Sequence, residues 1–240
     1  MQWSERAMGL WRWRRQRASA WGAVLDQQDI LLVALSLQQT GHVRVQVYEH
    51  LHAPEGLVHP LERDHWLGQT LHGLGTQLPA HLRSMGLALG ESRCREGVID
   101  WSGPHDMRRL QAEVQLEAAA AWQVPPDAVG FDFRAQACED GMALRLHWVA
   151  CLHQELTQWR QQARAAGWRL PLVEPEFQAA QRAAQCLRGK EQPDWAESPQ
   201  DWQFERTAQR ALDDVDWARL RAAPMWKRLV ACGAALGVLQ

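Results

Sequence analysis

Residues 30–37, ILLVALSL, form an apolar run that only Ser36 interrupts. A run of this length is typical of a β-strand that is buried on both faces of a sheet. Two neighbouring segments also have strand patterns: a short apolar run at 22–25 and, after a turn at Thr40-Gly41, an alternating segment at 43–48. Because helices must then cover the sheet from both sides, the sequence predicts an α/β fold.

A helix followed by a strand is predicted at residues 106–133. Apolar residues recur at three- and four-residue steps and predict one buried helix face, made of Met107, Leu110, Val114, Ala118 and Ala121. Asp106 can cap the N-terminus of this helix, and the Pro125-Pro126 pair ends it. After the prolines, Val129, Phe131 and Phe133 alternate with Gly130 and Asp132. This alternation predicts a strand with the three apolar side chains on one face.

The rest of the chain is assigned from the same two periodicities, with Gly and Pro marking the breaks. After a loop at 50–63 we expect a helix at 66–83, strands at 85–89, 98–101 and 142–151, a helix at 152–166, a strand at 170–173 and a helix at 174–187. A polar segment at 188–203, a brief helix at 204–212 and a last helical stretch within 215–239 complete the prediction.

Composition excludes several classes of protein. The net charge of −2 argues against a general nucleic-acid surface, which needs a basic excess. No run of 18 or more apolar residues is present, and the N-terminus lacks a signal-peptide pattern, so we expect a cytoplasmic protein. The five cysteines have no metal-binding or CxxC spacing and are expected to be reduced and mostly buried.

The first 20 residues form a basic and aromatic leader. Arginines at 6, 12, 14, 15 and 17 are interleaved with Trp3, Leu10, Trp11 and Trp13. Such a segment can rest on an anionic membrane surface, where each cation adds about 1 kcal/mol. The alternative is a loosely ordered leader whose tryptophans pack on the adjacent domain.

Four short motifs follow one another along the chain: Glu117-Ala118 with Pro125, the strand Val129-x-Phe131-Asp132-Phe133, the run Leu172-Val173-Glu174-x-Glu176, and Ala223-Pro224 followed by Ala231-Cys232-Gly233. In this order they resemble the PilM family, the actin-like proteins of type IV pilus assembly. The resemblance implies a reduced actin-like (ribonuclease-H-like) subdomain, called 1A, with an inserted α/β subdomain of the 1C type. The second actin-like domain of the family is largely missing.

The resemblance also implies a division of the chain. Residues 1–20 are the leader, 21–60 with 168–187 and 215–240 form subdomain 1A, and 61–167 form subdomain 1C. Residues 188–214 are a linker in the place of the second domain.

The phosphate loop that PilM proteins carry between their first two strands is degenerate in this sequence. In the family it is Asp-x-Gly-Ser-Ser-Ser-x-Lys, in which glycine and hydroxyls cradle phosphates. The aligned residues are Val24 for the acid, Asp26 for the glycine, Gln27, Gln28 and Asp29 for the serines, and Leu31 for the lysine. Two carboxylates there repel phosphate. We therefore expect no nucleotide cofactor and no ATP hydrolysis.

Other catalytic or metal patterns are weak. Asp26 and Glu174 could act as nuclease carboxylates, but a two-metal site needs more than two such groups. The acidic group Asp213, Asp214 and Asp216 is better explained as a solvated helix end. The ten histidines show no pattern such as HExxH, so neither a catalytic residue nor a metal ligand is predicted.

Two classes of function remain. The first is a non-catalytic scaffold of the pilus assembly platform, peripheral to the inner membrane. It would bind the cytoplasmic tail of a PilN-like bitopic protein in the cleft between 1C and the first strands, and it would contact other platform proteins and allow homo-oligomers. The residues expected at this site are Trp101, Arg108, Glu113, Glu117 and Trp122. The second class is a diverged actin-like ATPase. A cytoplasmic actin-like component of type II secretion is a further scaffold alternative.

Overall fold

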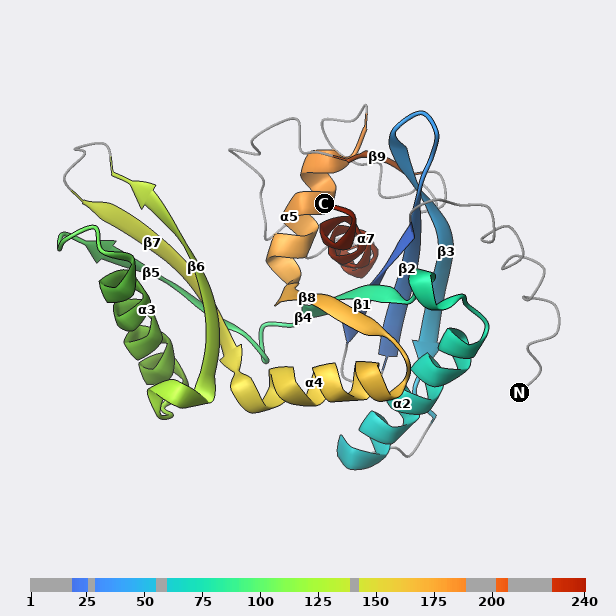
Figure 1. The fold of residues 1–240 in the computed structure, drawn as a ribbon, viewed down its shortest axis with the longest axis horizontal. Coiled ribbons are helices and arrows are strands. Elements are labelled where there is room, and N and C mark those ends of the chain that lie inside the picture. The colour runs from blue at the N-terminus through green and yellow to red at the C-terminus, as the bar shows by residue number, and fades with distance from the viewer. Residues whose placement is uncertain (1–18, 26–28, 55–59, 139–142, 189–201, 207–225) are drawn as a thin grey trace. The chain divides into compact units, whose positions relative to one another are not determined.

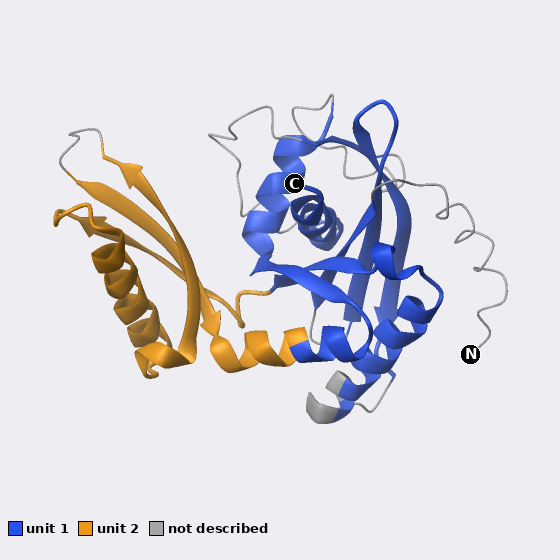
Figure 2. Cartoon of the chain, in the orientation of Figure 1, with its two compact units in different colours: residues 1–89, 161–240 blue, residues 90–160 orange. Residues whose placement is uncertain are grey.

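The computed structural model describes residues 19–25, 29–54, 60–138, 143–188, 202–206 and 226–240. These residues form two compact units (Figure 2). Unit 1 comprises residues 1–89 and 161–240, and unit 2 is the continuous segment Gly90–Arg160. Unit 2 is therefore inserted into unit 1 in the sequence.

The centre of unit 1 is a six-stranded sheet (Figure 1) with the order β8-β4-β1-β2-β3-β9. Its strands are β1 Ser19–Leu25, β2 Asp29–Leu37, β3 His42–His52, β4 Ser84–Leu89, β8 Arg169–Pro175 and β9 Gln203–Glu205. β1, β2 and β3 form an antiparallel meander, and β9 adds antiparallel to β3. β4 and β8 continue the sheet in parallel with β1.

The predicted turn between β2 and β3 is present. Gly41 has a φ of 82°, and its N–H donates to the carbonyl oxygen of Gln38 at 3.0 Å. A residue with a side chain is strained at this φ, so glycine is the residue that fits. The predicted meander is thereby confirmed.

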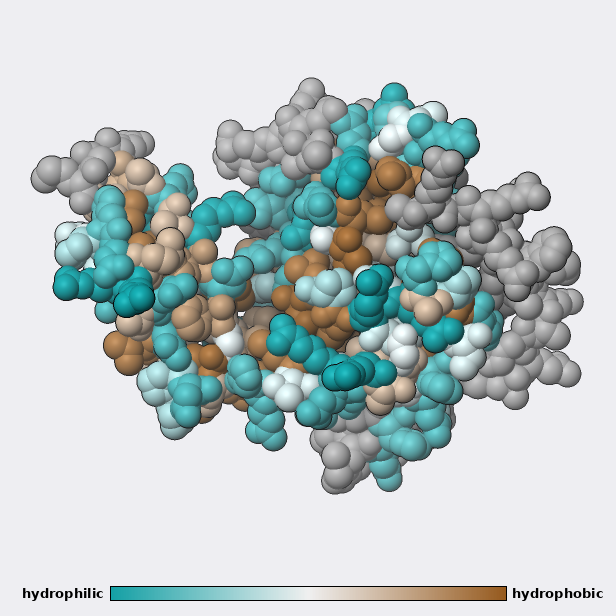
Figure 3. Space-filling model, in the orientation of Figure 1, coloured by the Kyte–Doolittle hydropathy of each residue, from teal (hydrophilic) through white to brown (hydrophobic). Residues whose placement is uncertain are grey.

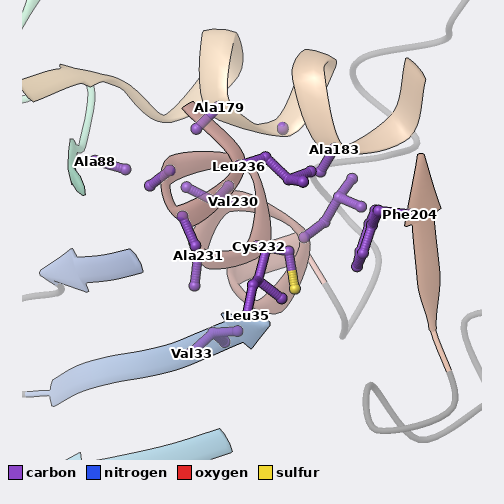
Figure 4. Packing of buried hydrophobic residues seen from close by; sticks show 14 of the residues in the cluster. Val33, Leu35, Ala88, Ala179, Ala183, Phe204, Val230, Ala231, Cys232 and Leu236 are labelled. Carbon is purple, nitrogen blue, oxygen red and sulfur yellow. The ribbon is translucent and has the colours of Figure 1, made fainter. Parts of the chain in front are cut away.

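Strand β2 is buried on both faces, as the apolar run predicts. Residues 30–36 are all buried, including Ser36 at 0% exposure. Val33 and Leu35 belong to a core cluster that includes the last helix, α7 (Trp226–Leu239; Figure 4). On β1, Trp21 lies at a right angle to the ring of Trp168, with ring centroids 5.5 Å apart.

Helix α7 is buried on nearly all sides. It packs on β1, β2 and β4 and on α5 (Glu176–Cys186), and every residue from Leu229 to Leu236 is buried. A Cβ on Gly22 of β1 would lie 1.9 Å from the carbonyl oxygen of Ala231, so backbone meets backbone there. Such an all-round apolar helix is stable only inside a core. Figure 3 shows brown, apolar residues in the part of unit 1 where Figure 1 labels α7.

One further helix, α2, lies in unit 1, and another, α4, spans the boundary between the two units in the sequence. Helix α2 spans Pro60–Thr76, and a 3-10 turn at Ala80–Leu82 follows it. The indole N–H of Trp168, just before β8, donates to the carbonyl oxygen of Leu71 in α2 at 2.7 Å. Helix α4 (His153–Ala165) begins in unit 2 and ends in unit 1.

Unit 2 is a three-stranded antiparallel sheet with one covering helix. Its strands are β5 Arg95–Trp101, β6 Val129–Ala137 and β7 Leu144–Leu152, with β7 in the middle, and a 3-10 turn at Pro126–Ala128 leads into β6. The helix is α3, Met107–Trp122, which Asp106 caps as predicted by accepting the N–H of Arg108 at 3.1 Å. Leu110, Val114 and Ala118 pack against the sheet.

Several sequence predictions differ from the structure. The buried face of α3 excludes its two ends: Met107 is 58% exposed, Ala121 is exposed, and Ala119 is buried instead. The helix does end before the Pro125-Pro126 pair, as predicted: its last residue is Trp122, and Gln123 adopts the left-handed conformation. Phe204 lies in strand β9 rather than in a helix, since it pairs with Val43 of β3.

The boundaries of the segments also differ. Ser19 and Ala20 begin β1 and are not part of a leader. The predicted loop at 50–63 is shorter, because β3 continues to His52 and α2 starts at Pro60. β4 pairs with β1 and β8, so residues 84–89 lie in the sheet of unit 1, whereas the sequence placed them in the insertion. Trp202 and Phe204, expected in a linker segment, are core residues of unit 1.

Candidate functional site

The first candidate site is the end of β1 and β2, where the resemblance places a phosphate loop. Val24 and Leu31 pair directly across the two strands and are 1% and 6% exposed. Both belong to the core cluster around α7, so their side chains are apolar packing residues in the positions of the acid and the lysine. Asp26, Gln27 and Gln28 lie outside the described residues. Neither Val24 nor Leu31 offers a group that can bind phosphate or a metal ion.

Asp29, the remaining residue of this loop, contacts two histidines. Its carboxylate oxygens lie 3.0 Å from Nε2 of His50 and 2.8 Å from Nδ1 of His52. The ligand-type atoms of the three side chains all lie within 4.8 Å of one another. The sequence pattern predicts no metal ligand among the histidines, and it therefore misses this group. The available signal was His50-Leu51-His52, because residues two apart in a strand share a face.

Glu174, the second carboxylate of the nuclease hypothesis, is held by an arginine. Its side chain is 4% exposed, and Arg182 of α5 donates to both of its oxygens at 2.5 and 2.7 Å. Arg182 also donates to the carbonyl oxygen of Gly233 in α7 at 3.0 Å. Burial raises the pKa of Glu174, and the arginine partly opposes this increase. The pair joins β8, α5 and α7, so we assign Glu174 a structural role.

The buried thiols are poor nucleophiles. Burial raises the pKa of Cys151 to about 11, and it also raises the pKa values of Cys186 and Cys232. A thiol is reactive as the thiolate, so these three cysteines act as small core residues. Cys94 and Cys138 are half-buried, and none of the five cysteines forms a disulfide.

The second candidate site lies in unit 2, where the partner-binding residues were predicted. Trp101 ends β5, and its indole N–H donates to the carbonyl oxygen of Pro104 at 3.1 Å. Trp122 ends α3 and stacks under the guanidinium of Arg95, which lies 4.6 Å from the ring centroid at the start of β5. Arg95 and Trp101 are six residues apart, which is about 20 Å along a strand. The two tryptophans therefore do not line a common pocket.

The charged residues predicted at this site lie on α3. Arg108 and Glu117 are exposed, and Glu113 is half-buried. Both Trp101 and Trp122 are half-buried against the core of unit 2, which gives each a packing role. The geometry leaves the outer edges of β5 and β6 without a neighbouring strand among the described residues.

The comparisons with known proteins concern the fold. The sequence matches no protein-family model and no curated protein. The structure is similar to that of a "PilM-PilN type IV pilus biogenesis complex", with a TM-score of 0.56 and 17% sequence identity over 70% of this chain. The match spans 51% of that other chain, so this protein covers about half of its relative. It also matches the cytoplasmic domain of EpsL, an inner-membrane component of the type II secretion system of Vibrio cholerae. That match has a TM-score of 0.49 and 16% sequence identity, and it covers 68% of this chain and 59% of the EpsL domain.

The first match defines the class of fold. The mixed α/β architecture, with a three-strand meander continued by two parallel strands, is similar to that of the matched chain in the PilM-PilN type IV pilus biogenesis complex. At 17% identity the likeness concerns the fold and does not identify an individual protein. Among the described residues, no helix has the length and apolar content that a membrane crossing requires.

Proposed function

We propose that this protein is a non-catalytic scaffold of a type IV pilus assembly platform. It works in the cytoplasm at the inner membrane and binds the cytoplasmic tail of a PilN-like bitopic protein. The observation that carries the proposal is the fold likeness to the PilM-PilN complex, together with apolar core residues at Val24 and Leu31. A fold of this class without a phosphate cradle retains its surfaces for binding other proteins.

The first candidate site supports the proposed loss of nucleotide binding. Phosphate needs backbone or hydroxyl donors and a cation, but the described positions supply two buried apolar side chains and one carboxylate. We expect millimolar Mg-ATP to leave the melting temperature unchanged. A nucleotide at 100 times its dissociation constant would instead add about 2.7 kcal/mol of stability. A clear rise in melting temperature with Mg-ATP would favour the diverged ATPase.

The edge of β5 is the surface that we assign to the partner tail. An extended peptide can add to a free sheet edge through main-chain hydrogen bonds, and its alternate side chains then contact the two faces of the sheet. Trp101 lies on the helix-covered face of β5, and Val98 lies on the opposite face at 55% exposure. One edge thus offers an aromatic contact on one face and an aliphatic contact on the other.

The test is a calorimetric titration. The cytoplasmic tail of the PilN-like bitopic protein is added to this protein, and the affinity is measured. Val98→Asp puts a charge at the β5 edge and should weaken binding. Leu116→Asp is the matched control, since Leu116 is 56% exposed and is not among the residues of α3 that pack in the core of unit 2. Equal affinities of the two variants would place the tail elsewhere. No binding by the unmodified protein would overturn the scaffold proposal.

A further inference from the structure

The strongest unassigned feature is the group formed by Asp29, at the start of β2, and His50 and His52, at the end of β3. His50 and His52 are two residues apart in β3 and therefore point to the same face of the sheet. Asp29 pairs directly with His52 across the ladder, and Leu31 pairs with His50. The hydrogen-bonded backbone of two adjacent strands thus holds all three side chains together.

The distances fit a metal ion with little movement. The two imidazole nitrogens approach different oxygens of one carboxylate, at 3.0 and 2.8 Å, and all ligand atoms lie within 4.8 Å of one another. A tetrahedral ion with bonds of about 2.0–2.2 Å spaces its ligands roughly 3.4 Å apart. Small side-chain rotations would bring the three atoms to this spacing.

The chemistry of the group selects the kind of ion. Two imidazoles and one carboxylate are a nitrogen-rich set, which suits zinc and similar divalent transition metals, whereas calcium and magnesium prefer oxygen ligands. The side chains of His50, His52 and Asp29 are 40%, 69% and 31% exposed, so water can reach the remaining coordination positions.

We propose that Asp29, His50 and His52 form a binding site for a zinc-type divalent cation. The site is independent of the proposed scaffold role, because it rests on the geometry of three side chains in unit 1. An ion bound there links the first residue of β2 to the end of β3.

The experiment is a titration of the full-length, reduced protein with zinc chloride, followed by calorimetry and thermal melting. We expect one ion per chain and a rise in melting temperature. Asp29→Asn, His50→Ala and His52→Ala should each lower the affinity by more than the roughly 10- to 100-fold that follows loss of an outer-shell partner. The double variant His105→Ala/His147→Ala is the control, because it removes two exposed imidazoles from unit 2.

Cobalt(II) in place of zinc identifies the ligand atoms. Nitrogen and oxygen ligands give weak d–d bands alone, whereas a cysteine ligand adds an intense thiolate charge-transfer band. Circular dichroism of each variant shows whether it is folded. The proposal is overturned if the unmodified protein binds no zinc, if folded ligand variants bind as well as the control, or if the cobalt complex shows thiolate charge transfer.

Discussion

Replacing Gly233 by alanine tests the closest contact in the core. A Cβ at this position of α7 would lie 1.7 Å from the carbonyl oxygen of Ala179 in α5. Non-bonded heavy atoms pack at about 3.5–4.0 Å, so the two helices would have to separate by roughly 2 Å. The clash is between the new Cβ, which has no rotamers, and a backbone oxygen, so no side-chain rotation relieves it.

Two opposing terms set the size of the effect. Alanine is a better helix former than glycine by about 1 kcal/mol. Overpacking a core costs about 1–3 kcal/mol and more where backbone must move, and here it separates two helices that share a buried cluster. We therefore expect Gly233→Ala to lower the free energy of unfolding by about 2 kcal/mol.

Gly73→Ala is the matched control. Gly73 lies inside helix α2, and nothing lies within 4 Å of the Cβ that alanine would add. This variant should gain roughly 0.5–1 kcal/mol from helix propensity alone. Urea unfolding followed by tryptophan fluorescence measures both variants. For a chain of this size, each 1 kcal/mol shifts the melting temperature by about 2–4 °C. If Gly233→Ala is as stable as Gly73→Ala, α7 does not pack against α5 as described.

Two further predictions concern the same core. Deleting the chain after Pro224 removes α7 and exposes its partners on β1, β2 and α5, so we expect insoluble protein; a monomeric, cooperatively unfolding product would contradict this. Arg182→Met leaves Glu174 buried without its counter-charge and should cost about 3–5 kcal/mol at neutral pH. Burial already raises the pKa of Glu174, and removal of Arg182 raises it further. The loss of unfolding free energy should therefore appear as pH rises through the elevated pKa of Glu174 and disappear below the ordinary pKa of 4.5. A deficit that does not change with pH, measured by urea unfolding, would contradict the role of Glu174.

Much of the fold is local in origin and could be predicted from the sequence. The meander β1-β2-β3 follows from apolar runs and the Gly41 turn, and the start of α3 follows from Asp106. The last helical stretch predicted within 215–239 is present as α7, which packs beside β2 with Leu229, Val230, Ala234 and Leu236 buried; Leu220 lies outside the described residues.

The differences arise where tertiary pairing decides the local structure. Phe204 becomes a strand residue because β3 offers an edge opposite Val43, and a three-residue segment carries no periodicity of its own. The Asp29 cluster was missed for a related reason. The alternation in β3 weakens after Tyr48, so the sequence ended the strand before His50 and His52, whereas pairing with β2 extends it.

The position of α7 in the chain also affects the order in which the protein is made. It is synthesised after every other described element, yet β1, β2, β4 and α5 all pack on it. Unit 2 is one continuous segment whose synthesis is complete before residue 161 is added. Domains fold as units during synthesis at about 5–20 residues per second. The inserted unit can therefore fold first on the ribosome, while the larger unit exposes an unfilled apolar surface until its last helix arrives.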